Sequence, residues 1–152
     1  MIYTFPRSAE FFQPAGLAMS TGLSSHIWEE ILVKEFMDNA LDAVDGLVDP
    51  AVTIQTGATL TVTDNGPGLD LQDFSAKILD FSSSVSSKLA WRRPSRGYLG
   101  NAWQTILAIS HQMSPGRPIV IESQGQRVSI TLRLTGDGFV QVEPKYSVAV
   151  KY

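Results

Sequence analysis

The amino-acid sequence predicts an α+β fold, with one mostly antiparallel sheet and helices on a single face. Strand-forming segments come in adjacent pairs, and helix-forming segments lie mostly in the first two thirds of the chain. The length of 152 residues suits one domain, and 43% hydrophobic residues can fill one core. We expect an N-terminal arm over residues 1–23 and a single domain over 24–152.

Hydrophobic periodicity and turn residues place the individual elements. Residues 8–12 could form a short strand or turn, which Pro14 and Gly16 then interrupt. Ser24 or Ser25 can cap the first long helix, and Gly46 follows it as a stop. Helices are expected over 24–45, 70–79 and 101–112. Strands are expected over 51–55, 58–63, 119–123, 127–134 and 139–142, and residues 146–152 could add another.

Composition excludes several classes of function. The chain has no cysteine, so disulfides, thiolate metal sites and thiol redox catalysis are excluded. The net charge of -3 does not predict nucleic-acid binding by this domain alone, so DNA contact is expected only indirectly or through a partner. No apolar run approaches the roughly 18 residues that span a bilayer. We expect a cytoplasmic protein without a membrane segment.

The first long helix carries a stripe of carboxylates with one amide. Glu35, Asn39 and Asp42 are spaced i, i+4, i+7 and share one face, with Asp38 on the same side. Mg²⁺ prefers such oxygen ligands and usually keeps waters and substrate phosphates as well. Glu35, one turn away, could orient or deprotonate an attacking water. A solvated polar face is the alternative interpretation.

An aspartate in a glycine-rich turn follows the strand expected over 58–63. Gly66 and Gly68 permit backbone angles and close approaches that other residues resist. The carboxylate of Asp64 could accept a hydrogen bond from the exocyclic amine of adenine. The alternative is a purely structural turn, because these residues form turns readily.

Residues 80–96 are rich in Ser, Lys and Arg and precede a second pair of glycines, Gly97 and Gly100. Backbone amides at a helix start attract phosphate oxygens, and glycines let phosphates come close. The loop could close over a triphosphate, or it could be a solvated surface loop. No Gly-Lys-Ser/Thr follows, so it is not a Walker A loop.

Three motifs together resemble the GHKL ATPase superfamily, which includes gyrase, histidine kinases and MutL. They are the N box and two glycine boxes of that family, here Glu35-x-x-x-Asn39-Ala40-x-Asp42-Ala43, then Asp64-x-Gly66-x-Gly68, then Gly97-x-x-Gly100-x-Ala102. Alanine stands where the family often has a third glycine. Order and spacing match over roughly residues 24–134. The resemblance implies the Bergerat fold, a two-layer α/β sandwich with a mixed, mostly antiparallel sheet and helices on one face.

The resemblance also implies a role for each matching position. Glu35 would be the general base for ATP hydrolysis, and Asn39 would bind Mg²⁺. Asp64 would read adenine, and Thr131 matches a family threonine near the adenine. The other positions would line the nucleotide site: Gly66, Gly68, Lys88, Gly97, Tyr98, Leu99, Gly100, Asn101 and Ala102.

Two short segments resemble the B subunit of topoisomerase VI. They are Ser8-Ala9-Glu10-Phe11-Phe12, and Ser87-Lys88 followed by Ser95-Arg96-Gly97. In those subunits a transducer domain follows, and its lysine contacts the γ-phosphate. This sequence contains no counterpart, so we expect either a fragment or a small relative whose protein partner supplies that domain. Homodimerisation through the N-terminal segment is also expected.

The function expected from the sequence is an Mg²⁺-dependent ATP-binding domain that hydrolyses ATP slowly. One alternative is a protein kinase of the anti-sigma or histidine-kinase type. Against it, Glu35 suits a water-activating base, and the only histidines, His26 and His111, suit structural roles. The other alternative is a non-catalytic interaction module that nucleotide switches.

Overall fold

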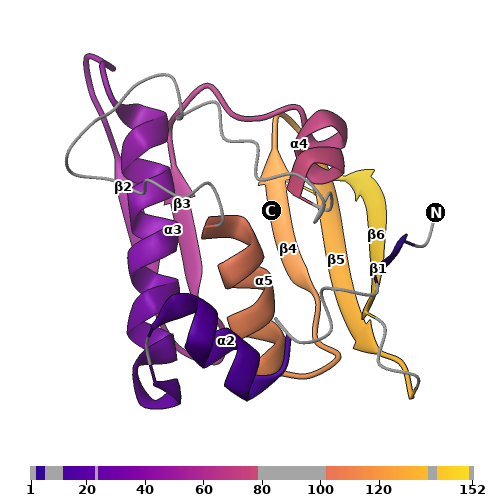
Figure 1. Ribbon diagram of the computed structural model, residues 1–152. Coiled ribbons are helices and arrows are strands. Elements are labelled where there is room, and N and C mark those ends of the chain that lie inside the picture. Colours follow the sequence, from indigo (N-terminus) through magenta and orange to yellow (C-terminus); the bar gives the residue numbers. More distant parts are fainter. Residues whose placement is uncertain (1–2, 6–11, 23, 79–101, 137–139, 151–152) are drawn as a thin grey trace.

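The computed structural model describes residues 3–5, 12–22, 24–78, 102–136 and 140–150 (Figure 1). In chain order the elements are β1 (Tyr3–Phe5), α2 (Pro14–Thr21), a 3-10 turn (Ser25–Ile27), α3 (Trp28–Val44), β2 (Val52–Gln55), β3 (Thr61–Asp64), α4 (Leu71–Ile78), α5 (Ala102–Met113), β4 (Ile119–Ser123), β5 (Gln126–Leu134) and β6 (Val140–Val148). The α+β prediction is confirmed.

The larger sheet has four strands in the order β1-β6-β5-β4, and each pairing is antiparallel. The central strand β5 alternates strictly, with Val128, Ile130 and Leu132 buried on one face. Side chains of a strand point to opposite faces in turn, so these three face the helices and their neighbours face outward. Most of the core therefore lies between this sheet and the helices.

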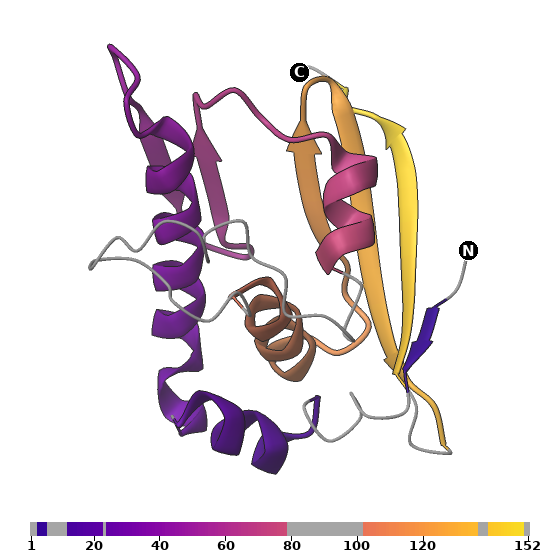
Figure 2. The ribbon, with the colours of Figure 1, turned by 45° about the horizontal axis from the view of Figure 1, so that its top comes forward.

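The strands β2 and β3 form a separate two-stranded antiparallel sheet, so the prediction of one sheet was wrong. Strands β3 and β4 point the same way in Figures 1 and 2, but no ladder joins them. The two sheets are instead joined at one end by side-chain bonds. The Leu69 amide donates to Ser123 Oγ at 2.6 Å, and Gln124 Nε2 donates to the Pro67 carbonyl at 3.1 Å.

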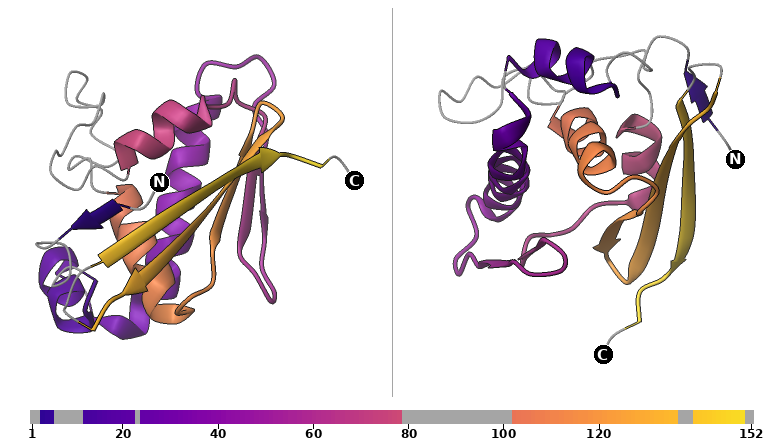
Figure 3. Two further views of the ribbon diagram at one scale, coloured as in Figure 1. Left: turned by 90° about the vertical axis from the view of Figure 1, so that its right-hand side faces the viewer. Right: turned by 90° about the horizontal axis from the view of Figure 1, so that it is seen from below.

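The helices α3, α4 and α5 lie on the same side of both sheets, which gives two layers (Figure 3). This agrees with the expected helices on one face and is compatible with an α/β sandwich. Trp103 of α5 packs edge-on against Phe36 of α3 and Phe74 of α4, with ring centres 6.0 Å and 4.9 Å apart. Among the described residues, fully buried side chains at the centre of the core come from several elements: Phe12, Leu17, Leu71, Ile106, Leu107, Ile109, Val128, Ile130, Val140 and Val142.

Two helix starts differ from the sequence prediction. Pro14 and Gly16, expected as breakers, lie inside α2, because Pro14 occupies the first turn, where its missing amide is not needed. Helix α3 begins at Trp28 rather than at 24, after the 3-10 turn. The Ser24 hydroxyl bonds to His26 Nδ1 at 2.8 Å and caps no helix amide.

The C-terminal strands also differ, because β6 runs unbroken to Val148 instead of ending near residue 142. Pro144 pairs with Ile130 on the β5 side. On its other side, the described pairs of β6 with β1 cover residues 140–142, and Pro144 lies beyond them, so its missing amide breaks none of the described ladder bonds there. Across the described part of the chain, none of the helices combines the length and apolar character that crossing a membrane requires.

Candidate functional site

Helix α3 presents the predicted polar stripe. Glu35, Asn39 and Asp42 are all half-buried, so they face neither the open solvent nor the centre of the core. The Asn39 Nδ2 atom is buried and has no hydrogen-bond partner among the described residues. A buried polar atom without a partner carries a free-energy cost, which a ligand or water can relieve.

Lys34 joins two carboxylates of this stripe. Its Nζ lies 2.8 Å from Asp38 Oδ2, one turn on, and 3.3 Å from Glu35 Oε1. The Asp38 hydrogen bond raises the pKa of Lys34 above its ordinary value, and the Glu35 charge adds to this against the opposing effect of burial. Asp38 is thus the stronger ion-pair partner of Lys34, and Glu35 is the weaker one.

The glycine turn after β3 comes directly to this helix. The Gly66 amide donates to Asp64 Oδ1 at 2.8 Å. A Cβ on residue 66 would lie only 2.9 Å from the Ala43 carbonyl oxygen and 3.1 Å from its Cβ. Ala43 is one turn beyond Asn39 on the same side of α3. The structure therefore brings the Asp64 turn next to the helix face that carries Asn39.

Asn65, which the sequence analysis did not assign, holds the turn on its other side. Its Oδ1 accepts from the Ala51 amide at 2.8 Å, and its Nδ2 donates to the Asp49 carbonyl at 2.7 Å. The backbone amide of Asn65 also donates to the Ala51 carbonyl at 3.2 Å. The frequent use of Asn in turns was the available signal, but its partners lie about fifteen residues earlier in the chain.

Gly68 allows a close approach on the opposite flank of the turn. Its φ is +79°, and a Cβ there would lie 2.6 Å from Ser123 Oγ and 3.0 Å from Gln124 Cγ. The turn between β4 and β5 therefore fits against residues 67–69. Ser123 and Gln124 were also missed by the sequence analysis, since no local pattern links them to residue 68.

Thr131 does not lie with Asn39 and Asp64. It is half-buried on β5, between the inward-facing Ile130 and Leu132, so its side chain points to the outer face of the sheet. Ala102 is the first residue of α5. The other predicted phosphate-site residues fall outside the described residues: Lys88, Gly97, Tyr98, Leu99, Gly100 and Asn101.

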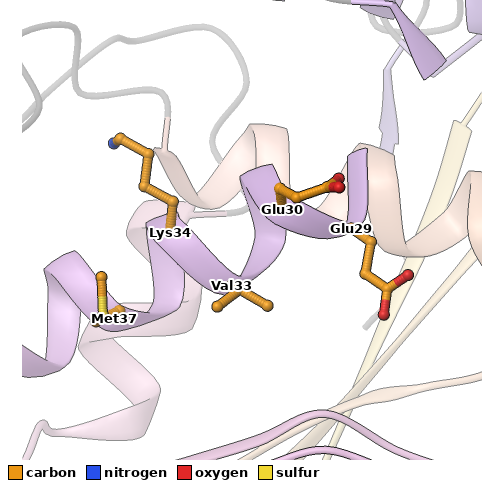
Figure 4. Close-up of a pocket in the computed structure, with 5 residues that line it drawn as sticks. All are labelled: Glu29, Glu30, Val33, Lys34 and Met37. Atoms are coloured by element: carbon orange, nitrogen blue, oxygen red, sulfur yellow. The ribbon is translucent and has the colours of Figure 1, made fainter. Parts of the chain in front are cut away.

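A shallow depression of about 480 Å³ lies along a different face of α3. Figure 4 shows its lining, which comes entirely from one side of that helix: Glu29, Glu30, Val33, Lys34 and Met37. The helical spacing places Glu30 opposite Asn39. Because the lining includes neither Asn39 nor Asp64, this depression is not the predicted nucleotide site.

The described residues contain no cluster of three or more His, Cys, Asp or Glu side chains that could hold a metal ion.

The chain is similar to a known protein over most of its length. It is 27% identical over 113 residues to the DNA mismatch repair protein MutL of Listeria innocua serovar 6a, a match that covers 72% of this chain and 18% of that relative. This similarity supports a GHKL-type ATP-binding domain. It does not favour the topoisomerase VI B subgroup over other members. No family model matches the chain, and no solved structure is significantly similar to it.

The similarity covers only a small part of the relative. The chain spans less than a fifth of the MutL relative, so the activity of that whole protein does not transfer to it. The first two motifs meet in space, and the third lies mostly outside the described residues.

Proposed function

We propose that this chain binds ATP with Mg²⁺ and hydrolyses it slowly, as a GHKL-type domain. One observation carries the proposal. The Asp64 turn packs on α3 at Ala43, beside a half-buried Asn39 whose Nδ2 atom has no hydrogen-bond partner among the residues that the structure describes. This contact brings the two predicted halves of the site together, which supports the nucleotide-site interpretation over two unrelated features.

The proposed roles follow from the chemistry of each side chain. Asp64 accepts a hydrogen bond from the exocyclic amine of adenine, and a base without that amine leaves the carboxylate unpaired. Asn39 is the residue that would hold Mg²⁺, and the bound ion would neutralise part of the charge on the phosphates. The Asn39 amide is neutral and so does not repel them.

Glu35 is the proposed general base for water. It lies one turn before Asn39 on the same face of α3. Lys34, which also contacts Asp38, limits the orientations of the Glu35 carboxylate. A single positioned base contributes typically about 10²–10⁴-fold to a rate, which is consistent with slow turnover where other groups are absent.

Further proposals from the sequence stay predictions. They are a topoisomerase VI B-like subgroup, a homodimer through the N-terminal segment, and a protein partner that supplies a transducer-like domain and any DNA contact. Of the short segment 8–12 that suggested the subgroup, only Phe12 is among the described residues, where it is buried in the core.

The binding proposal is tested by calorimetric titration of the protein with ATP, with and without Mg²⁺. We expect binding that Mg²⁺ strengthens, and a loss of about tenfold or more in affinity in Asp64→Asn, because the single amide oxygen of asparagine cannot accept from both the Gly66 amide and the exocyclic amine. An absence of binding by the wild-type protein at millimolar nucleotide would refute the proposal.

Hydrolysis is tested separately with Glu35→Ala. Phosphate release should fall to the background level while ATP affinity changes little, because the base acts only on the attacking water. Glu30→Gln is the matched control, since it removes a carboxylate from the opposite face of the same helix. Turnover in Glu35→Ala equal to wild type would remove Glu35 from this role.

A further inference from the structure

The exposed turn that follows strand β3 is held by hydrogen bonds of the Asn65 side chain. Asn65 makes two side-chain hydrogen bonds and one backbone bond to residues 49–51, at 2.7–3.2 Å. These residues lead into β2, whose Val52 pairs with Asp64 in the hairpin. The Asn65 bonds therefore continue the hairpin ladder one step past its last strand pair.

The backbone of Asp64 is therefore restrained on both sides. On one side it belongs to the ladder through Val52. On the other, Asn65 is fastened to Ala51, and the next amide, that of Gly66, donates to Asp64 Oδ1 at 2.8 Å. One carboxylate oxygen is thus oriented by the turn itself. The direction of the second oxygen depends on where the turn backbone is held.

The chemistry at this position needs a side chain that can both accept and donate. The Ala51 amide requires an acceptor, and the Asp49 carbonyl requires a donor. The asparagine amide supplies both at once, whereas an aspartate could serve only the Ala51 amide and an alanine could serve neither. Without this side chain, residue 65 keeps only its backbone bond, in a region exposed to water where local opening is easy.

We propose that Asn65 is a positioning residue for adenine recognition, which acts by aiming the Asp64 carboxylate. This inference rests on the proposed ATP binding. It assigns to Asn65 the specificity of the site and not its phosphate or metal affinity. Asn65 itself touches no nucleotide in this scheme, so its effect must pass through Asp64.

The test compares ATP with inosine triphosphate, which carries the same phosphates but lacks the exocyclic amine. Both affinities are measured with Mg²⁺, by calorimetry for ATP and by displacement of ATP for the analogue. In Asn65→Ala we expect ATP affinity to fall by about tenfold and the affinity for inosine triphosphate to stay at the wild-type value. Thr63→Ala is the control, because Thr63 is exposed and, by strand alternation, points to the face of β3 opposite that of Asp64.

Each outcome decides a separate point. Failure of the wild-type protein to bind ATP would overturn the proposed function. If the wild-type protein binds ATP, either of two results would overturn the role of Asn65. The Asn65→Ala protein could keep full ATP affinity, or it could lose affinity for both nucleotides in equal proportion. If Asn65→Ala does not fold, Asn65→Asp keeps the acceptor for Ala51 and should show the same split with a smaller loss.

Discussion

The two sheets of this protein differ in how they are held. In the four-stranded sheet, β5 and β6 pair over nine residues and bury Val128, Ile130, Val140 and Val142 almost completely. In the β2–β3 hairpin, four residues pair with four, and every side chain is half-buried or exposed. Apolar burial stabilises the four-stranded sheet, while the hairpin depends on a few close contacts and hydrogen bonds.

The candidate site lies on the weakly buried region. The hairpin is positioned by the contact of Gly66 with Ala43, by the Asn65 bonds and by the bonds to Ser123 and Gln124. A few close contacts and hydrogen bonds of this kind can orient the Asp64 carboxylate without extensive burial of apolar side chains. The comparison therefore predicts that folding stability and nucleotide affinity can be changed separately.

The largest expected effect is on the four-stranded sheet. Ile130→Ala removes a fully buried side chain and should lower the free energy of unfolding by about 2–5 kcal/mol, because a cavity is left in the core. Denaturant titration measures this change. Under conditions where the variant is folded, its ATP affinity should equal that of wild type. A selective loss of affinity there would contradict the separation of the two regions.

A smaller effect on stability, but a larger one on affinity, is expected in the hairpin. Gly66→Ala places a Cβ against the Ala43 carbonyl, a backbone atom that cannot rotate away. The overlap should cost about 1–3 kcal/mol and displace the Asp64 turn, with a loss of ATP binding in calorimetry. Gly57→Ala is the control, since nothing lies within 4 Å of a Cβ at that hairpin position. Wild-type affinity in Gly66→Ala would show that the helix contact does not position the site.

The smallest effect concerns His111, on α5 in the core region. Burial lowers its pKa below the ordinary 6.5, and its Nδ1 is buried without a partner among the described residues. The unfolded chain therefore binds the proton more readily than the folded one. The contribution of the neutral ring to the free energy of unfolding is complete above pH 6.5 and is lost as the pH falls below that value. Urea unfolding at a series of pH values should show a shallower acid decline for His111→Gln than for wild type. Equal declines in stability with falling pH in the two proteins would contradict the prediction. The affinity for ATP should not change with the substitution.

Sequence patterns predicted most elements but not all of their limits. Periodicity placed α3, α4 and α5 within a few residues, and strand β4 at its observed bounds. It failed at α2, where Pro14 starts a helix, and at β6, where Pro144 lies within a strand. In both cases the proline is tolerated because its missing amide interrupts none of the described ladder or helix bonds, and this depends on the neighbouring elements.

The candidate site was predicted in part for a similar reason. Helical spacing alone placed Glu35 and Asn39 on one face, and the glycine pattern alone predicted a tight turn after Asp64. The positions of Thr131 on the outer face and of Gly68 against Ser123 follow from strand pairing and from contacts across more than fifty residues. No local pattern contains that information.

The sequence by itself determined the local features: the carboxylate stripe, the glycine turn and the alternation of β5. These arise from interactions within a few residues, where spacing and backbone freedom decide the outcome. Only the tertiary structure decided that the turn lies against Ala43, that Asn65 is fastened to residues 49–51, and that the sheet is divided in two. Those contacts depend on how the hairpin packs on α3, and packing is a property of surfaces that meet only after the chain has folded.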